Sequence, residues 1–399
     1  MSSMKTFRFE NFIELKRGFD LPDSKVIEGD YPVVAASSIK TYHNEFKVYS
    51  PIVTTGRSGT LGKVLYVEEN GWPLNTTLYV KDFKNNNPLY VYYYLKLMHL
   101  EQFNSGVGVP TLNRNHLNSI KVKIHELDKQ KSLVDIVNKY DLLIENNNKR
   151  IKTLKQMAEE LYKEWFVRFR YPNNDETLKK SDLGDIPETF EIKKIGDVIN
   201  YYIGGGWGND ESSANFPIDA YVIRGADFPK VIKGDISSTP KRFHKNSNYK
   251  TRKLVVGDIV FEISGGTQEQ PVGRSVLITK GLLEQYNNSV ICASFCKLVR
   301  VNSDLISPVY FWYWLQYMYD TRMIERFQLQ STGIINFKFE YFLRKGLILI
   351  PPIELIEKFE NYVMNLRKEI DYLAIANANL IKQRDLLLPR LMSGKLEVK

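Results

Sequence analysis

Two long stretches of the chain contain apolar residues at spacings that alternate between four and three. They comprise residues 133–165 and 359–391. A seam with this period, sustained over more than four heptads, is typical of coiled-coil helices, whereas a helix that packs on a globular core has a broader apolar face. The sequence therefore predicts two long helices, and the Pro-Pro pair at 351–352 marks the start of the second.

An antiparallel arrangement brings the ends of the two seams into alignment. In such a pair Leu133 lies opposite Leu391 at one end. At the other end Trp165 lies opposite Phe359, and every layer joins an a position to a d position. The pattern thus predicts an antiparallel coiled coil with a length of roughly 50 Å, because each helical residue adds about 1.5 Å.

Polar residues interrupt the two seams at matching levels. In the antiparallel register Asn147 lies opposite Asn377, where two amides satisfy each other and fix the register at some cost in stability. Tyr140 lies opposite Arg384, which predicts a cation–π contact. These four residues are therefore predicted to set the register of the coiled coil.

The segments that precede the two predicted helices resemble each other. Residues 307–318 repeat the Pro, Tyr, Tyr, Leu and Met of residues 87–98 at an offset of 220, and in both copies the proline stands where a helix would begin. A glycine turn between two strands and a later short strand are predicted in both copies, at residues 53–64 and 120–124 and at residues 261–276 and 347–350. The chain is therefore predicted to contain a duplicated domain.

These patterns together predict an α+β protein. Two repeated α/β domains are separated by two long helices that form an antiparallel coiled coil, so a pseudo-two-fold axis relates the halves. Such a protein suits two half-sites on a DNA duplex. The predicted boundaries are 1–126 for the first domain, 127–172 for the first spacer helix, 173–350 for the second domain and 351–399 for the second spacer helix.

The composition indicates a soluble, cytoplasmic protein. Of the 399 residues, 43% are hydrophobic and 25% are charged, which is typical of globular domains. No run approaches the roughly 18 apolar residues that cross a bilayer, and the first residues lack the apolar stretch of a secretory signal. Cys292 and Cys296 lie in an apolar run without nearby Cys or His partners, so they are predicted to be reduced core thiols.

The formal net charge of +9 permits a polyanionic partner. Positive charge is concentrated between residues 224 and 253, where nine Lys or Arg residues stand against two Asp and no Glu. Such a segment suits nucleic-acid binding, but it equally suits a solvated loop. Charge alone therefore does not decide between these interpretations.

No motif in the sequence predicts catalysis or metal binding. The glycine-rich segment at 56–63 ends in Lys, but Arg57 stands where a phosphate-binding P-loop needs glycine. Asp185 with Glu191 and Lys193 resembles a nuclease metal site only loosely, so an interpretation as surface charge is favoured. The five histidines form no ligand cluster. The chain is therefore expected to have no catalytic residue and no metal site of its own.

Two segments of the predicted helices resemble a known family. Residues 157–169 (Met-Ala-Glu-Glu-Leu-Tyr-Lys-Glu-Trp-Phe-Val-Arg-Phe) and residues 386–396 (Leu-Leu-Leu-Pro-Arg-Leu-Met-Ser-Gly-Lys-Leu) are similar to the central and C-terminal conserved regions of type I restriction-modification specificity (S) subunits. The order domain, helix, domain, helix extends this resemblance over nearly the whole chain. The Gly-Thr-Leu-Gly-Lys turn at 59–63 adds support.

The resemblance implies that each α/β domain is a target recognition domain that reads one half of a gapped, asymmetric sequence in double-stranded DNA. The helices would set the gap and dock methyltransferase (M) subunits, two being expected, which bind S-adenosylmethionine and flip the target adenine. Restriction (R) subunits, which hydrolyse ATP and cut DNA, would join this core. The chain itself is expected to bind no cofactor, with S-adenosylmethionine, ATP and Mg on the partner subunits.

Side chains suited to DNA contacts cluster in predicted loops of both domains. Arg, Lys, Asn and Gln read base edges, and Ser, Thr, Lys and Arg bind phosphates. The candidates in the first domain are Lys40, Thr41, His43, Asn44, Arg57, Ser58, Thr60 and Lys63. The candidates in the second domain are Lys241, Arg242, His244, Lys245, Arg252, Lys253, Thr267, Gln268, Gln270 and Arg274. The alternative for each residue is a solvated position in a loop.

Two alternative hypotheses stand beside a role as a DNA-recognition subunit. The first is a stand-alone DNA nuclease or methyltransferase with a divergent site, which cutting or methyl transfer by the isolated chain would favour. The second is a structural adaptor whose coiled coil binds only protein. Salt-dependent binding to duplex DNA would argue against the adaptor.

Overall fold

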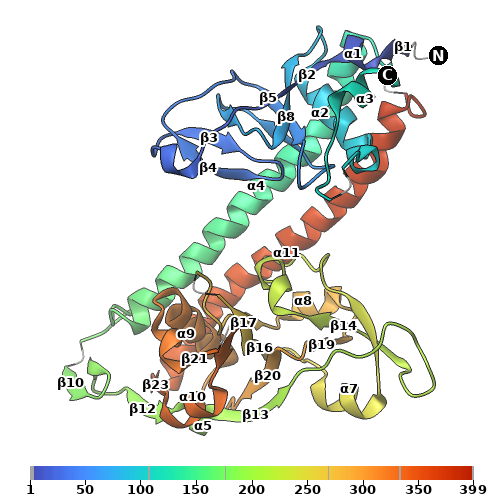
Figure 1. The fold of residues 1–399 in the computed structure, drawn as a ribbon. Helices are drawn as coiled ribbons and strands as arrows, with labels where there is room; N and C mark the ends of the chain where they lie inside the picture. The colour runs from blue at the N-terminus through green and yellow to red at the C-terminus, as the bar shows by residue number, and fades with distance from the viewer. Residues whose placement is uncertain (1–3, 107, 176, 268, 332–333, 398–399) are drawn as a thin grey trace. The chain divides into compact units, whose positions relative to one another are not determined.

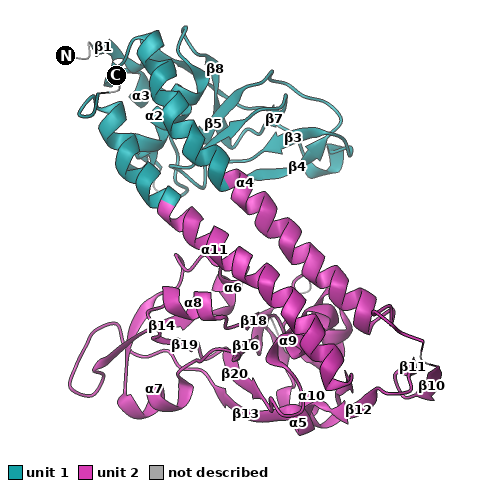
Figure 2. Cartoon of the chain, turned by 180° about the vertical axis from the view of Figure 1, so that it is seen from behind, with its two compact units in different colours: residues 1–144, 380–399 teal, residues 145–379 magenta. Residues whose placement is uncertain are grey.

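A computed structural model describes residues 4–106, 108–175, 177–267, 269–331 and 334–397 of the chain. The chain forms two compact units, unit 1 with residues 1–144 and 380–399 and unit 2 with residues 145–379 (Figure 2). Each unit contains an α+β part and segments of two long helices, α4 (Leu127–Phe166) and α11 (Ile353–Met392) (Figure 1). Both helices are 40 residues long, so the two long helices predicted from the heptads are confirmed.

In the described residues, the α+β part of unit 1 forms three sheets. Their strand orders are β2-β8-β5-β6, β4-β3-β7 and β1-β9. The strands are β1 (Lys5–Arg8), β2 (Glu14–Arg17), β3 (Tyr31–Val34), β4 (Ile39–His43), β5 (Ile52–Gly56), β6 (Val64–Val67), β7 (Trp72–Pro73), β8 (Thr77–Asp82) and β9 (Lys121–Ile124). The helices are α1 (Phe9–Phe12), α2 (Pro88–Leu97) and α3 (Arg114–Asn118), with short 3₁₀ turns η1 (Asp23–Lys25) and η2 (Leu100–Phe103).

Helix α2 connects the sheets of unit 1 to the long helices. It begins as the sequence predicts, because Asn87 accepts a hydrogen bond from the backbone N of Tyr90 at 3.1 Å and Pro88 occupies the first turn. Tyr90 and Tyr93 are fully buried in a core that also includes Leu133 of α4 and residues near the end of α11. The aromatic run of α2 therefore packs in the protein core.

The part of unit 2 that the structure describes forms five sheets. Their strand orders are β13-β20-β16-β18, β15-β14-β19, β17-β22-β21, β12-β23 and β10-β11. The strands are β10 (Leu178–Ser181), β11 (Gly184–Pro187), β12 (Glu191–Lys194), β13 (Ile199–Gly204), β14 (Ile218–Ile223), β15 (Lys241–His244), β16 (Ile259–Glu262), β17 (Ser264–Gly266), β18 (Ser275–Leu277), β19 (Val290–Cys292), β20 (Cys296–Val301), β21 (Gln328–Ser331), β22 (Ile334–Phe337) and β23 (Leu347–Ile350). The helices are α5 (Ile195–Val198), α6 (Phe228–Val231), α7 (Asn246–Arg252), α8 (Lys280–Gln285), α9 (Pro308–Asp320) and α10 (Phe339–Lys345), with 3₁₀ turns η3 (Gly225–Asp227) and η4 (Met323–Phe327).

The strand order of unit 2 repeats that of unit 1. The sheet β13-β20-β16-β18 matches β2-β8-β5-β6, and the sheet β15-β14-β19 matches β4-β3-β7. Even the parallel pairing recurs, because β3 is parallel to β7 and β14 is parallel to β19. The pair β12-β23 corresponds to β1-β9, and α9 begins with Ser307 and Pro308 where α2 begins with Asn87 and Pro88. The internal repeat predicted from the sequence is therefore present in the topology.

The two cysteines lie where unit 2 is densely packed. Cys292 ends β19 and Cys296 begins β20, and both thiols are free and buried. Burial raises the pKa of the Cys292 thiol to about 12, so this side chain stays protonated and packs as an apolar group. Among the described residues, no group of three or more His, Cys, Asp and Glu side chains is placed to hold a metal. No helix within the described residues is long and apolar enough to span a membrane.

Candidate DNA-recognition surfaces and helix contacts

Within unit 2, α4 and α11 contact each other through apolar layers and one layer of amides. Nδ2 of Asn147 donates to Oδ1 of Asn377 at 2.9 Å, and Nδ2 of Asn377 donates to Oδ1 of Asn148 at 3.1 Å. The ring of Trp165 lies 6.2 Å from that of Phe359. Residue numbers rise along α4 as they fall along α11, so the two segments in this unit are antiparallel. Sequence reasoning missed Asn148, because it lies beside the seam.

The amides of Asn147 and Asn377 are expected to lower the stability of the protein relative to an apolar layer. Replacing both residues, Asn147→Leu with Asn377→Leu, is expected to raise the free energy of unfolding by about 1 kcal/mol, because an apolar layer replaces buried amides. The register of the helices should become less specific, while the DNA sequence choice should not change. Thermal unfolding measures the first effect, and cross-linking between engineered cysteines measures the second.

The single variant Asn147→Leu is the control for this prediction. It should lower the melting temperature, because Asn377 loses one partner while its side chain remains buried. A double variant that is less stable than the single variant would contradict the assignment of these amides to the register.

Within unit 1, a tyrosine from the α+β part joins a polar cluster between the two helices. The hydroxyl of Tyr93 donates to Oδ2 of Asp141 at 2.6 Å, and Nη1 of Arg384 donates to Oδ1 of Asp141 at 2.5 Å. Burial and the hydrogen bond to Asp141 raise the pKa of Tyr93. The sequence predicts a cation–π contact between Arg384 and Tyr140, but the structure pairs Arg384 with Asp141 instead. In the described residues its guanidinium pairs with Asp141, since a charge-assisted bond to the neighbouring carboxylate is stronger than stacking on Tyr140.

The glycine turn of unit 1 is hydrogen-bonded to a second loop. The backbone N of Gly59 donates to O of Pro110 at 3.0 Å, and N of Leu112 donates to O of Arg57 at 2.8 Å. Unit 2 has the corresponding arrangement, because β17 pairs with β22 in the sheet β17-β22-β21. We call this surface the glycine-turn surface. In unit 1 it consists of the turn after β5 and the loop around Pro110 and Leu112. In unit 2 it consists of β17, which follows β16, and its partner strand β22.

The glycine-turn surface of unit 1 contains four of the predicted DNA-binding residues. Thr60 and Lys63 are exposed, and Ser58 is half-buried. Within the described residues Lys63 forms no ion pair, so its charge is available to a phosphate. Nε of Arg57 donates to the backbone O of Asn75 at 3.0 Å, which holds this side chain close to the neighbouring turn.

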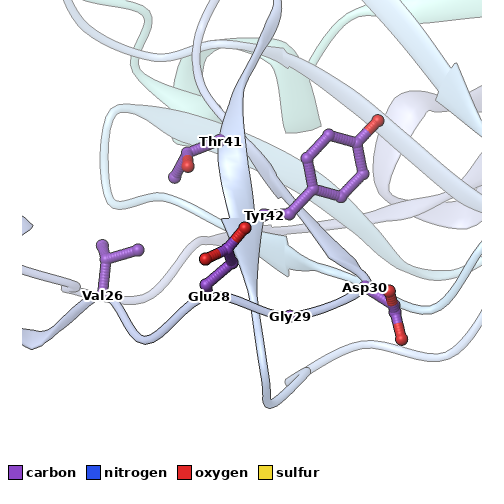
Figure 3. A pocket seen from close by; sticks show the side chains of 6 residues that line it. All are labelled: Val26, Glu28, Gly29, Asp30, Thr41 and Tyr42. Carbon is purple, nitrogen blue, oxygen red and sulfur yellow. The ribbon is translucent and has the colours of Figure 1, made fainter.

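A second group of predicted residues lies on β4. Lys40 forms an ion pair with Asp23 at 2.5 Å. Thr41 lines a shallow pocket together with Glu28 and Asp30, and Figure 3 shows the Glu28 carboxylate beside the strand that contains Thr41. Negative charge at this edge disfavours a DNA phosphate. The residues of β4 are therefore less suited to backbone contacts than the glycine-turn surface.

The two predicted histidines lie in the interior. His43 and His244 are 4% and 2% exposed, and they occupy equivalent ends of β4 and β15. Nδ1 of His43 lies 3.1 Å from both the backbone N and O of Ile27, and its ring packs against Trp72. Burial lowers the pKa of His244. Both histidines are therefore buried and are not placed to contact DNA. Asn44, the next residue after His43, is exposed.

The basic segment of unit 2 interleaves with aromatic rings. The guanidinium of Arg242 lies 4.6 Å from the centroid of Trp207 and pairs with Asp210, while Nε of Arg252 donates to O of Gly204 at 2.9 Å. Sequence reasoning missed Trp207, although an aromatic residue close to a basic segment is a usable signal. The exposed lysines also lie over rings, with Lys241 over Tyr221, Lys245 over Phe216 and Lys253 over Tyr249.

The remaining candidates lie around the glycine turn of unit 2. Arg274 forms two hydrogen bonds with Glu262, at 2.9 and 2.5 Å, and Glu262 is only 2% exposed. The structure therefore makes Arg274 the counter-ion of a buried carboxylate. Thr267 and Gln270 are exposed, and N of Thr267 donates to O of Gln270 at 2.8 Å in a turn. Gln268 lies outside the described residues.

Comparisons with known proteins show which proteins this chain is similar to. Residues 1–156 match the family model described as "Type I restriction modification DNA specificity domain". The resemblance to type I specificity subunits predicted from the sequence is therefore confirmed. The first part of the chain is thus similar to a domain that is described by its DNA specificity in type I restriction modification.

Particular relatives extend this similarity beyond the first domain. The type I restriction enzyme MjaVIII specificity subunit of Methanocaldococcus jannaschii is 24% identical, over 98% of this chain and 92% of its own length. The MjaIX specificity subunit of the same organism is 24% identical, over 77% of this chain and 69% of its own length. The crystal structure of a type I restriction-modification S subunit from M. genitalium aligns with a TM-score of 0.59, covering 100% of this chain and 97% of that chain. At 13% sequence identity, this structural likeness shows a shared fold.

Proposed function

We propose that this chain is the specificity subunit of a type I restriction-modification complex and that it reads a bipartite, gapped DNA site. The observation that supports this most strongly is the duplicated topology, with one strand order and one glycine-turn surface in each unit. Two α+β parts with the same topology but different exposed side chains suit the two unlike halves of an asymmetric site. Each part would place its loops in a groove and use exposed Lys and Thr residues to hold the phosphates.

The two long helices supply the spacer in this proposal. We propose that α4 and α11 form an antiparallel coiled coil over their whole length, with a pseudo-two-fold axis at the layer of Asn147 and Asn377. The contacts inside each unit support this arrangement, because Asp141 pairs with Arg384 in unit 1 and Asn147 pairs with Asn377 in unit 2. A stiff spacer converts the length of the helices into the gap between the half-sites.

Chemistry on DNA belongs to the partner subunits in this proposal. The helices would dock two M subunits that bind S-adenosylmethionine and flip the target adenine, and R subunits that use ATP and Mg would cut the DNA. A direct test incubates the pure chain with DNA, Mg²⁺ and S-adenosylmethionine, with and without the M subunit encoded in the same host. Adenine methylation is expected only with the partner. Methyl transfer or cutting by the chain alone would instead favour a stand-alone enzyme.

The binding of the chain to DNA should depend on salt in a way that identifies phosphate contacts. Lys63→Ala in unit 1 and Lys245→Ala in unit 2 are each expected to weaken binding and to reduce the slope of log K against log salt by about 1. Fluorescence anisotropy with a labelled duplex at several salt concentrations measures this slope. The matched control is Lys139→Ala, an exposed lysine on α4, which should leave the slope unchanged. Equal slopes in all four proteins would contradict the proposed surfaces.

A further inference from the structure

In the described residues, polar side chains of α4 and α11 contact each other at three levels along the helices. Asp141 of α4 pairs with Arg384 of α11 in unit 1. In unit 2, Nη2 of Arg150 pairs with Oε1 of Glu369 at 2.7 Å, and the amide of Asn147 donates to Asn377. The side chains of Asp141 and Arg384 are only 27% and 16% exposed, so a mismatch at this contact would be partly buried.

The duplicated seams make other pairings of the same helices conceivable. The seam of α11 repeats the seam of α4 at an offset of 226 residues, so every α4 position has an equivalent on α11. The apolar layers alone therefore do not distinguish a pair of α4 with α11 from a pair of two α4 helices or of two α11 helices. The polar residues do differ between equivalent positions. Arg367 is equivalent to Asp141, and Ala158 is equivalent to Arg384.

A pair of two α11 helices would bring like charges together. In that pairing Arg384 meets Arg367, because Arg367 occupies the position of Asp141. Arg367 has little freedom to avoid this contact, since its side chain is 4% exposed and its guanidinium lies 5.0 Å from the ring of Trp312. Asn377 would meet Leu373, which leaves an amide against an apolar side chain.

A pair of two α4 helices would lose these polar contacts. Asn147 would meet Ile151, and Arg150 would meet Leu143, the residue equivalent to Glu369. Asp141 would meet Ala158, a residue that is fully buried in unit 2. Both pairings of identical helices therefore leave charges or amides without partners at positions where the pairing of α4 with α11 satisfies them.

We infer that these polar residues select the partner helix, so that α11 accepts an α4-type helix, with Asp at 141 and Asn at 147, and rejects a second copy of itself. The inference rests on the antiparallel coiled coil in the proposed function and adds specificity to it. Discrimination of this kind combines one attractive arrangement with repulsion in the competing ones. A protein with two equivalent seams needs such a device, because exchange of helices between chains would otherwise produce mixed assemblies.

Full-length variants with complementary charge reversals test this selection. In D141R the α4–α11 contact becomes Arg against Arg, and in R384D it becomes Asp against Asp. When the two variants are co-expressed, exchange of helices between the chains restores both ion pairs. We expect at least tenfold more mixed dimer, measured by mass photometry with two affinity tags, than when either variant is co-expressed with the wild type. The single-chain double variant D141R/R384D should stay as monomeric as the wild type.

Matched controls separate charge complementarity from general destabilisation. D135R and K382D reverse exposed charges on the same two helices, and neither position forms an ion pair in the described part of the chain. A mixed dimer in the same amount from D135R with K382D would overturn the inference, as would the lack of a mixed dimer from D141R with R384D. DNA binding by the wild type is measured separately. Its failure would refute the proposed function without changing the result on helix pairing.

Discussion

Arg274→Ala is expected to lower the free energy of unfolding of unit 2 by about 3–5 kcal/mol, because it leaves a buried carboxylate without its counter-ion. Glu262 is 2% exposed and accepts two hydrogen bonds from the Arg274 guanidinium, at 2.9 and 2.5 Å. Chemical denaturation monitored by tryptophan fluorescence measures the loss. Lys250→Ala, an exposed control in the same unit, should change the free energy of unfolding by less than about 0.5 kcal/mol.

A second variant distinguishes this structural role from reading of a base. Replacing both partners, Arg274→Met with Glu262→Leu, is expected to recover most of the lost stability, because an apolar pair of similar size needs no counter-ion. If Arg274 acts only as a counter-ion, DNA affinity recovers together with stability. A stable double variant that has lost discrimination at one base pair would instead make Arg274 a base-reading residue among the DNA contacts that the sequence predicts.

The two long helices and the internal repeat could be predicted from the sequence because both produce periodic or repeated patterns. A spacing of 3.5 residues identifies α4 and α11, and the Pro-x-Tyr segments identify α2 and α9 as equivalent helices. Each of these signals uses many residues, so one exception does not remove it. The same periodicity predicts that Asn147 and Asn377 face each other across the helix pair. Their amides are hydrogen-bonded in unit 2.

The individual site residues could be predicted less well because their roles depend on contacts that no local pattern encodes. A seam places Arg384 near Tyr140, but it does not show that Asp141, one residue further, competes for the guanidinium. The sequence predicts His43 in a polar loop, yet it ends the edge strand β4 and its ring packs against Trp72. The pairing of Arg274 with Glu262 follows from the β16-β18 hairpin, whose register the sequence does not specify.

Inserting one heptad into α4 after Asn147 and one into α11 before Asn377 is expected to change the gap of the recognised site without changing the bases in its two halves. Seven residues add roughly 10 Å to each helix and preserve the seam, so pairing continues through the insertion. Mapping methylated adenines in a host that expresses the variant with its M subunit measures the gap. Seven residues with the same sequence added after residue 399 serve as the control.

The geometry of DNA limits how far the gap can follow the spacer. About 10 Å corresponds to at most three base pairs, since successive base pairs are roughly 3.4 Å apart. Each added base pair also rotates the second half-site by roughly 35°, because B-DNA turns once in about 10.5 base pairs, whereas a heptad returns the helix faces to nearly their original direction. We therefore expect a gap that is longer by one to three base pairs and an affinity reduced by the cost of twisting the DNA. An unchanged gap with normal affinity would show that distance is measured by the loops of the two α+β parts, and the spacer role of α4 and α11 would be refuted.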